Sequence, residues 1–241
     1  YIRRDSVLAR NGRLIRSPAW DRWGMIGQYS CDVGVIVGAY LPTPTQKKVD
    51  AALREALAAG ADVESRRTDS VTRTPLASVV DPRSTVSKER RPACVRALLL
   101  AGASPSAPIK GRRSHWMPLH EAATLGLYTV CRLLLDAGAD VNVQSVDDCD
   151  NDTPLHCAAV LNSNQKVIAL LLSRGAVDGP NVDRLVRSSY LQKVRAAGSF
   201  AAYEKQHRAK LVATLAPKLG HLLPPELVSV VITFWAPVGL H

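Results

Sequence analysis

Short apolar runs recur along the middle of the chain, and four of them end at a Gly-Ala step. The glycines of these steps are Gly60, Gly102, Gly138 and Gly175, at spacings of 42, 36 and 37 residues. A glycine after an apolar run is typical of a helix end, because only glycine enters the φ > 0 region at little steric cost. The pattern therefore predicts a series of similar helices that recur at a nearly constant period.

A second marker recurs in phase with the first and predicts where helices begin. It reads Thr-Pro-Leu-Ala at Thr74–Ala77, Met-Pro-Leu-His at Met117–His120 and Thr-Pro-Leu-His at Thr153–His156. Threonine is a good N-cap, and proline is tolerated in the first helical turn because the N–H groups of that turn have no helical partner. The next repeated glycine comes 20 and 21 residues after the last two prolines, a distance that is enough for two short helices and a tight turn. The second helices, Val130–Leu135 and Val167–Leu172, are nearly apolar all round, which predicts that they form an inner layer.

Together these markers resemble the ankyrin-repeat family, whose repeat of about 33 residues carries a Thr-Pro-Leu-His signature. The strongest matches are Pro118–Ala123 and Thr153–Ala159, with Gly138–Val141 in phase. The first unit matches less well, because Ala77 stands in the histidine position. The resemblance implies an all-α solenoid of helix-turn-helix units with β-hairpin fingers between them.

The resemblance covers only the middle of the chain. We expect three regions, namely a basic, irregular N-terminal arm over residues 1–45, ankyrin repeats over 46–180 and a helical C-terminal extension over 181–241. The repeat region is expected to divide into a half-repeat at 46–69 and full units at 70–106, 107–143 and 144–180. Within the extension, Ser199–Leu215 predicts a helix with Ser199 as its N-cap.

The first full unit contains an insertion that is a candidate binding loop. From Pro75 to its glycine it has 27 residues against 20 in the unit from Pro118, and the surplus lies in the basic loop Asp81–Arg91. Insertions in repeat arrays map to one face and often serve binding. A second basic loop precedes Trp116, and the two could hold phosphate or an acidic partner, with Trp116 stacking on a base or filling a pocket. The alternative is a pair of solvated tips, with Trp116 folded onto the repeats. The candidate residues are Arg83, Lys88, Arg90, Arg91, Lys110, Arg112, Arg113 and Trp116.

An acidic loop in the next unit is a further candidate for partner binding, through Asp147, Asp148 and Asp150. Its spacing resembles the start of a calcium loop, which also needs glycine at the sixth position and glutamate at the twelfth. Those positions hold Thr153 and Ala159. We therefore expect a solvated tip or a contact for a basic partner and no metal site.

Nothing in the residue pattern predicts catalysis. The family resemblance implies that His120 and His156 make structural hydrogen bonds to the backbone near the hairpins. The chain has no Gly-rich phosphate loop, nucleophile elbow, His-Glu-x-x-His motif or paired-cysteine motif. We expect no enzyme activity, no cofactor and no small-molecule substrate.

The charge of the chain favours an acidic partner, since 31 Lys and Arg stand against 21 Asp and Glu, a net charge of +10. The surplus lies mainly towards the two ends, because residues 143–180 carry 2 basic against 5 acidic groups. The five cysteines are scattered and odd in number, which favours a reducing, intracellular compartment. No uncharged stretch reaches the length of a membrane span. The Arg-rich start fits either an organellar protein, such as a mitochondrial one after removal of its presequence, or a cytoplasmic protein with a basic arm.

The segment Leu223–Trp235 predicts a last helix and is similar, over 13 residues, to the opening of an F-box. That similarity implies a substrate adaptor of a ubiquitin ligase, and the alternative is a helix that simply caps the repeats. The candidate docking residues are Leu223, Pro225, Glu226, Leu227, Phe234 and Trp235.

The favoured function is a non-catalytic scaffold that binds other proteins through its fingers and terminal arms, as a structural subunit of a larger assembly. Contact of the basic loops with an RNA backbone would suit the net charge of +10, in a ribonucleoprotein such as an organellar ribosome. The ubiquitin-ligase adaptor is the alternative.

Overall fold

The computed structural model describes most of the repeat region, the helices that follow it and a few residues elsewhere. The described residues are 7–8, 14–15, 51, 54, 58, 62–64, 73–84, 86–109, 116–145, 152–160, 165–177, 188–219, 224, 227–228 and 230–231. The helices with assigned bounds are α4 (Pro75–Val80), α5 (Arg91–Leu100), α6 (Pro118–Thr124), α7 (Tyr128–Asp136), α8 (Pro154–Val160), α9 (Gln165–Ser173), α11 (Ser189–Ala196) and α12 (Phe200–Leu219). None of the helices in this part of the chain is long and apolar enough to cross a membrane.

The N-terminal arm contains a pair of short strands that the sequence did not predict. Strands β1 (Val7–Leu8) and β2 (Leu14–Ile15) pair antiparallel, with Val7 opposite Ile15. The expected irregular arm thus has at least this short piece of regular structure.

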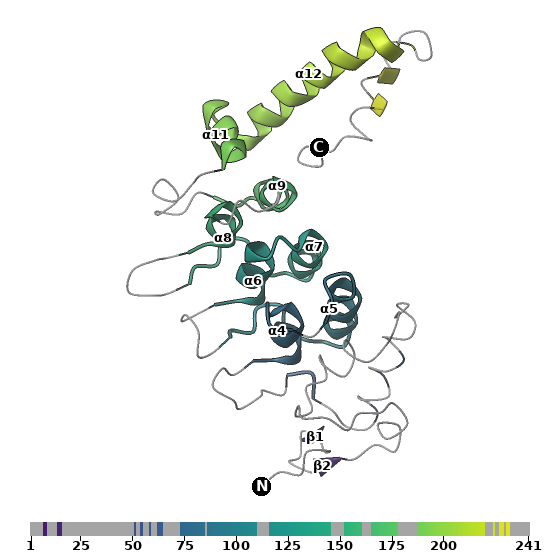
Figure 1. Ribbon diagram of the computed structural model, residues 1–241, viewed down its shortest axis with the longest axis vertical. Coiled ribbons are helices and arrows are strands. Elements are labelled where there is room, and N and C mark those ends of the chain that lie inside the picture. Colours follow the sequence, from purple (N-terminus) through teal and green to yellow (C-terminus); the bar gives the residue numbers. More distant parts are fainter. Residues whose placement is uncertain are drawn as a thin grey trace.

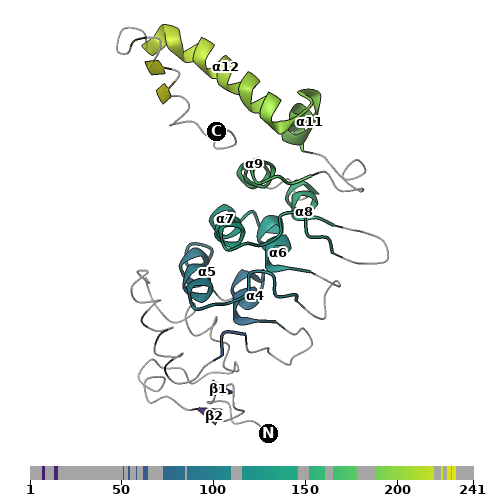
Figure 2. The ribbon, with the colours of Figure 1, turned by 180° about the vertical axis from the view of Figure 1, so that it is seen from behind.

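The helices from α4 to α9 stack as three pairs in two layers. In both views α4, α6 and α8 lie one above another, and α5, α7 and α9 form a second column beside them (Figures 1 and 2). Contacts run within each pair and between equivalent helices of neighbouring pairs. The predicted all-α solenoid of helix-turn-helix units is confirmed.

The first helix of each pair begins where the recurring Thr-Pro-Leu-His marker predicts. Thr74 Oγ1 accepts a hydrogen bond from the N–H three residues later at 3.4 Å, and Thr153 Oγ1 does the same at 3.3 Å. Met117 has no hydroxyl, and its N–H instead donates to Nδ1 of His120 at 3.1 Å. Each pair therefore satisfies a backbone N–H at its start through a side chain, although the chemistry differs.

The second helix of each pair ends at the repeated glycine. Gly102, Gly138 and Gly175 have φ of 91°, 89° and 86°. The N–H of the following alanine donates to a leucine carbonyl five residues earlier, at 3.0, 3.0 and 2.9 Å. This is the helix end that a glycine at φ > 0 makes accessible, so the prediction is confirmed at three of the four sites. Gly60 lies outside the described residues.

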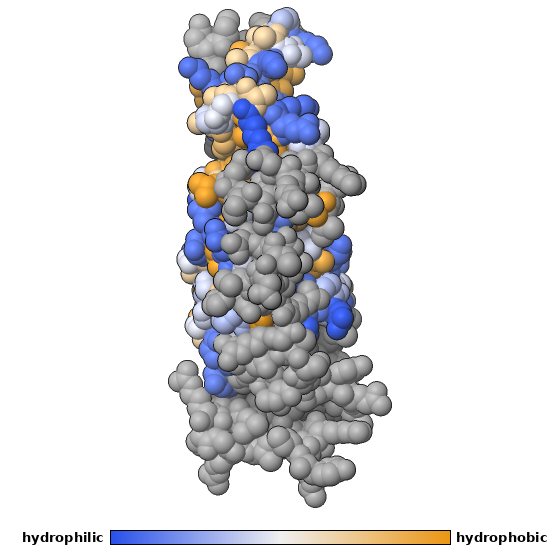
Figure 3. Space-filling view, turned by 90° about the vertical axis from the view of Figure 1, so that its left-hand side faces the viewer, coloured by the Kyte–Doolittle hydropathy of each residue, from blue (hydrophilic) through white to orange (hydrophobic). Residues whose placement is uncertain are grey.

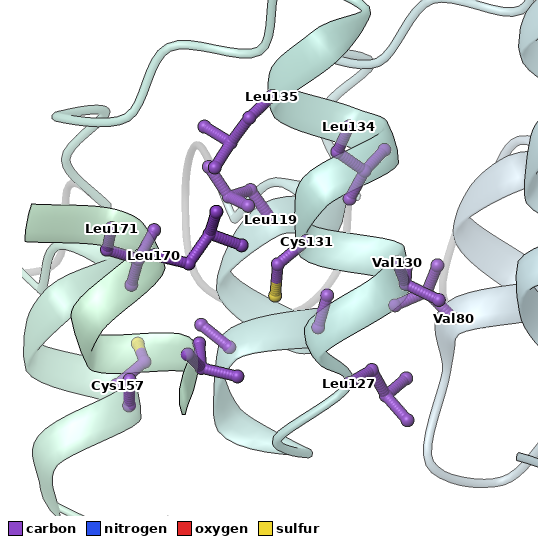
Figure 4. Packing of buried hydrophobic residues seen from close by; sticks show 14 of the residues in the cluster. Val80, Leu119, Leu127, Val130, Cys131, Leu134, Leu135, Cys157, Leu170 and Leu171 are labelled. Atoms are coloured by element: carbon purple, nitrogen blue, oxygen red, sulfur yellow. The ribbon is translucent and has the colours of Figure 1, made fainter. Parts of the chain in front are cut away.

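The core is a continuous row of aliphatic side chains between the two layers. Leu98, Leu134 and Leu171 hold the same place in α5, α7 and α9, and each is 0% exposed. Leu119 and Cys131 fill the space between α6 and α7 beside them (Figure 4). Burying a leucine side chain contributes about 1.5–3 kcal/mol, so the row supplies much of the stability of the stack.

The prediction of an inner layer, made for Val130–Leu135 and Val167–Leu172, is confirmed for Val167–Leu171, which are all buried, and is wrong for Val130–Leu135. Every residue of Pro118–Ala123 is buried, whereas α7 exposes Arg132 and Asp136. The first helices are also covered by the chain that precedes them, since Trp116 lies against α6. One side of α7 has no such cover among the described residues and faces solvent.

A buried chain of polar contacts joins the second pair to the third. Trp116 Nε1–H donates to Glu121 Oε2 at 2.6 Å, and the indole stacks on His120 at a centroid distance of 4.8 Å. His120 Nε2 lies 3.1 Å from the carbonyl oxygen of Asp152, whose N–H donates to Ser145 Oγ at 3.2 Å. Buried polar groups need such partners, so these contacts fix how neighbouring units align.

A fourth pair, α11 and α12, follows the three regular ones. Its connection contains Gly198 at φ 85°, as the connection between α6 and α7 contains Gly126 at φ 67°. Tyr190, Leu191 and Val194 of α11 are buried and belong to the same hydrophobic core as the repeats. The turn between α6 and α7 therefore recurs here without the Thr-Pro-Leu-His marker.

Helix α12 departs from the repeat pattern. Ser199 Oγ accepts a hydrogen bond from the N–H of Ala202 at 3.1 Å, which confirms the predicted N-cap. The helix is 20 residues long and runs to Leu219, past the predicted end at Leu215, and none of its residues is fully buried. Rather than lying parallel above α9, it rises obliquely away from the stack (Figures 1 and 2).

Candidate partner-binding surface

The inserted loop between α4 and α5 is ordered by its own hydrogen bonds. Asp81 accepts a hydrogen bond from the N–H of Arg83 at 2.6 Å through Oδ1 and pairs with Arg73 at 2.9 Å through Oδ2. The N–H of Val86 donates to Ser84 Oγ at 3.3 Å, and the Val86 side chain is buried. The seven surplus residues thus form a defined loop whose middle is anchored in the core.

Arg91 holds the same loop in place from the interior of the protein, and it is not a surface residue. Its Nε–H donates to the carbonyl oxygen of Val86 and its Nη1–H to that of Val80, both at 3.1 Å. The side chain is 4% exposed, and burial lowers the pKa of its guanidinium while Asp81 and Glu121 oppose that shift. The prediction that Arg91 contacts a partner is corrected, because its hydrogen bonds and burial hold the loop in place.

The groups that this loop presents to solvent are Arg83, Lys88 and Glu89, with Arg90 half-buried behind them. A hydrogen bond from its own backbone N–H, and a second from Ser87, lower the pKa of Glu89. The loop therefore offers a mixed patch in which basic side chains outnumber the single carboxylate.

Trp116 is the second candidate that lies in the interior. It is 7% exposed, and its indole is engaged by the Glu121 carboxylate and the His120 ring. A buried ring with its N–H bonded to the protein cannot stack on a base or enter a partner's pocket. The alternative raised from the sequence, a tryptophan folded onto the repeats, is the one observed.

The remaining loop candidates fall outside the described residues. They are Lys110, Arg112, Arg113, Asp147, Asp148 and Asp150. The bases of both loops are described, and each closes with one backbone hydrogen bond, from Ile109 N–H to the Trp116 carbonyl (2.8 Å) and from Ser145 N–H to the Asp152 carbonyl (3.0 Å). Their role in partner binding stays a prediction.

The interpretation that the two basic loops form one combined site stays a prediction. The inserted loop ends where α5 begins, at Arg91. The second loop begins after Ile109, nine residues beyond the end of α5 at Leu100, and its basic residues lie outside the described part of the chain.

The two marker histidines are structural. His120 bridges the N–H of Met117 and the carbonyl oxygen of Asp152, and His156 lies in contact with the Asp152 carboxylate through Nδ1. Both are buried. In the part of the chain that the structure describes, no group of three His, Cys, Asp or Glu side chains could hold a metal ion.

The C-terminal docking candidates are described at one position only. Leu227 is 47% exposed, whereas its neighbour Val228 is fully buried against the last turns of α12. Val230 and Val231 are also exposed, at 60% and 40%. The other candidates, Leu223, Pro225, Glu226, Phe234 and Trp235, lie outside the described residues.

One set of exposed cations was not singled out from the sequence. These are the lysines of the terminal pair, Lys193, Lys205, Lys210 and Lys218, all exposed. The sequence feature that pointed to these lysines was the excess of basic over acidic residues in the last sixty residues of the chain. That excess has no periodicity, so it could not show which of the basic groups gather on one exposed element.

Comparison with known proteins agrees with the repeat structure. Residues 84–183 match the family model of ankyrin repeats (3 copies). Protein fem-1 homolog C, from Homo sapiens and from Mus musculus, is 34% identical over 95 residues, covering 34% of this chain and 15% of the relative. The human transient receptor potential cation channel subfamily A member 1 is 37% identical over 86 residues, covering 36% of this chain and 7% of the channel protein. The chain thus matches only a small part of each relative's length.

Proposed function

Because residues 84–183 are ankyrin repeats, which serve as protein–protein interaction scaffolds, we propose that this chain is a non-catalytic scaffold and a structural subunit of a larger assembly. Repeat arrays bind through extended surfaces made of loops and exposed helix faces, and contacts between neighbouring units supply their stability. Loops can therefore vary without loss of the fold.

The inserted loop between α4 and α5 carries this proposal. Buried Arg91 donates to two backbone carbonyls beneath it, while Arg83 and Lys88 stand exposed above. A loop that is held rigidly loses little conformational entropy on binding, which favours affinity. Its basic side chains suit a partner with an acidic surface.

The test is capture of partners from the native cell extract by the tagged full chain, with R83E/K88E as the loop variant. The matched control is R96E/R132E, which reverses two exposed arginines on the outer helices. The proposal expects the loop variant to lose a protein partner that the wild type and the control retain, with circular dichroism unchanged in all three. Identical partner sets for the two variants would contradict a binding role for the loop.

A second candidate function, substrate adaptor of a ubiquitin ligase, draws support from the segment after α12. Val228 is buried against α12 while Leu227 and Val231, four residues apart, are exposed. Residues four apart lie on one face of a helical turn, so the two exposed side chains form a small apolar surface. L227E/V231E should then abolish capture of ligase components. Capture of the same components by this variant, or of none by the wild type, would exclude the adaptor.

The compartment belongs to the same proposal. Cys94, Cys131 and Cys157 are buried free thiols, which fits a reducing compartment such as the cytoplasm or an organellar matrix. Fractionation of the native cells would test it.

A further inference from the structure

Basic charge is concentrated in the terminal pair of helices. Residues 188–219 contain six Lys and Arg and one acidic residue, Glu204, so the segment carries 6 − 1 = +5 of the net +10 of the whole chain. This is half the net charge in 32 residues of 241. A local excess of this size raises the concentration of anions around the element and speeds their association.

Most of this charge is not neutralised within the protein. Glu204 pairs with Arg208 four residues later, at 2.5 Å. Lys193, Lys205, Lys210 and Lys218 are exposed, and none of them has an ion pair with another residue in the described part of the chain. The four lysines are therefore available to an external anion.

The position of α12 makes these side chains accessible. It rises obliquely from the stack, and no regular repeat lies over it (Figures 1 and 2). Hydrophilic side chains surround the apolar ones at the top of the molecule, where α11 and α12 lie (Figure 3). The helix is 20 residues long, or about 30 Å.

The spacing of the lysines indicates the shape of the partner. Lys205, Lys210 and Lys218 are five and eight residues apart, so on a helix of 3.6 residues per turn they point in three different directions. A docked partner helix would meet one stripe of residues three and four apart. A flexible polyanion that winds partly around α12 can instead reach all three.

The side chains between the lysines indicate contact with a phosphate backbone rather than with bases. Ala201, Ala209, Ala213 and Thr214 are exposed and small or polar, which allows close approach. No aromatic side chain of α11 or α12 is exposed, because Tyr190 is buried and the rings of α12 are half-buried. A stacking platform for bases is absent from this pair, so the contact would be independent of base sequence.

We propose that α11 and α12 form a binding surface for the phosphate backbone of single-stranded nucleic acid. Lys205, Lys210 and Lys218 are its principal contacts, each as a point charge, with Lys193 at its edge. The surface is separate from the inserted loop that is proposed to bind proteins, so the chain would join a nucleic acid to a protein partner.

The test measures binding of a fluorescein-labelled poly(U) oligonucleotide to the full chain by anisotropy, between about 50 and 200 mM salt. The variant is K205E/K210E/K218E, and the control R96E/R132E/K166E makes the same change of charge on the exposed outer helices. The surface variant should bind at least tenfold more weakly and lose about 2 from the slope of log K against log salt, since each single-strand phosphate contact contributes about 0.7. The control should retain most of the affinity and the slope.

Equal loss in the two variants would overturn the proposal, because it would show attraction by net charge alone. So would poly-glutamate competing as well as RNA at equal charge, which would indicate an acidic protein partner. Capture of protein partners from RNase-treated extract distinguishes this inference from the scaffold function. The α12 variant should capture them normally even if the RNA experiment fails.

Discussion

The second regular pair, α6 and α7, and the terminal pair, α11 and α12, are joined by the same kind of turn but pack differently against the rest of the chain. Gly126 and Gly198 both stand at φ > 0 between two helices. In the regular pairs, helix α7 packs between α5 and α9. Polar contacts such as that from His120 to Asp152 also join one unit to the next. In the terminal pair three residues of α11 are buried, whereas α12 has no fully buried residue. A repeated local turn therefore does not by itself make a repeated packing.

The largest effect on stability should come from substitutions in the buried row of leucines between the two layers. Helix α5 contains both a buried leucine and an exposed one that serves as the control. Leu98 is 0% exposed and Leu100 is 79% exposed, two residues apart in α5. Leu98→Ala should lower the free energy of unfolding by about 2–5 kcal/mol, because it leaves a cavity between the layers. Leu100→Ala should change it by less than about 0.5 kcal/mol. Urea unfolding measures both, and equal losses would contradict the stacked core.

A smaller effect should separate the polar chain of the regular pairs from the terminal pair. Trp116→Phe keeps a ring against His120 and removes the N–H donor to the buried Glu121, which should cost about 1–3 kcal/mol. Tyr190→Phe in α11 removes a buried hydroxyl that has no hydrogen-bond partner in the described structure, so it should be neutral or slightly stabilising. Thermal unfolding tests the pair. A loss at Tyr190 as large as that at Trp116 would show that the terminal pair has a polar network of its own.

The two glycine turns should differ in how far their damage spreads. Alanine at Gly138 or at Gly198 meets no atom within 4 Å, so the cost is the strain of an L-residue at φ 89° or 85°, about 1–2 kcal/mol. Gly138→Ala should lower amide protection throughout α4 to α9. Gly198→Ala should lower it only in α11 and α12, because α12 has no buried residue. Hydrogen exchange reads out the difference, and loss of protection in α5 on Gly198→Ala would contradict it.

The smallest effect is that of pH on the free energy of unfolding, because these groups change stability only above about pH 9. Burial raises the pKa of Cys94 to about 11 and that of Cys131 to about 12, from 9.0. The folded chain thus holds these protons more tightly than the unfolded chain. Their stabilisation is complete below pH 9 and is lost as pH rises through 11 to 12. The melting temperature should fall across that window, and C94A/C131A should flatten the fall. An unchanged fall in the double variant would assign it to other groups, such as Tyr190, whose pKa burial also raises.

Features that depend on local chemistry could be predicted from the sequence. Thr74 and Ser199 cap helices as expected, and Gly102, Gly138 and Gly175 end them. Each outcome depends on a few neighbouring residues, whose hydrogen bonds and φ preferences act whatever the rest of the chain does.

The candidate site was predicted less well, because exposure is not a local property. Arg91 and Trp116 occur in basic, polar stretches and yet lie in the interior. Arg91 is buried because it donates to the carbonyl oxygens of Val80 at the end of α4 and Val86 in the loop. Trp116 is buried because Glu121 and His120 contact it from the next helix. The basic terminal pair was overlooked for the opposite reason, since its lysines follow no period that marks a surface.

The period of the repeat, the helix starts and the helix ends were determined by the sequence alone. Proline, glycine and capping side chains act within one turn of the backbone. Only the tertiary structure decided which helices are enclosed, which basic residues face solvent and that α12 leaves the stack. Those outcomes depend on contacts between segments about 30 to 40 residues apart, as with His120 and Asp152. Such contacts form only when the units pack against one another, because burial is a property of the assembled layers and not of any single helix.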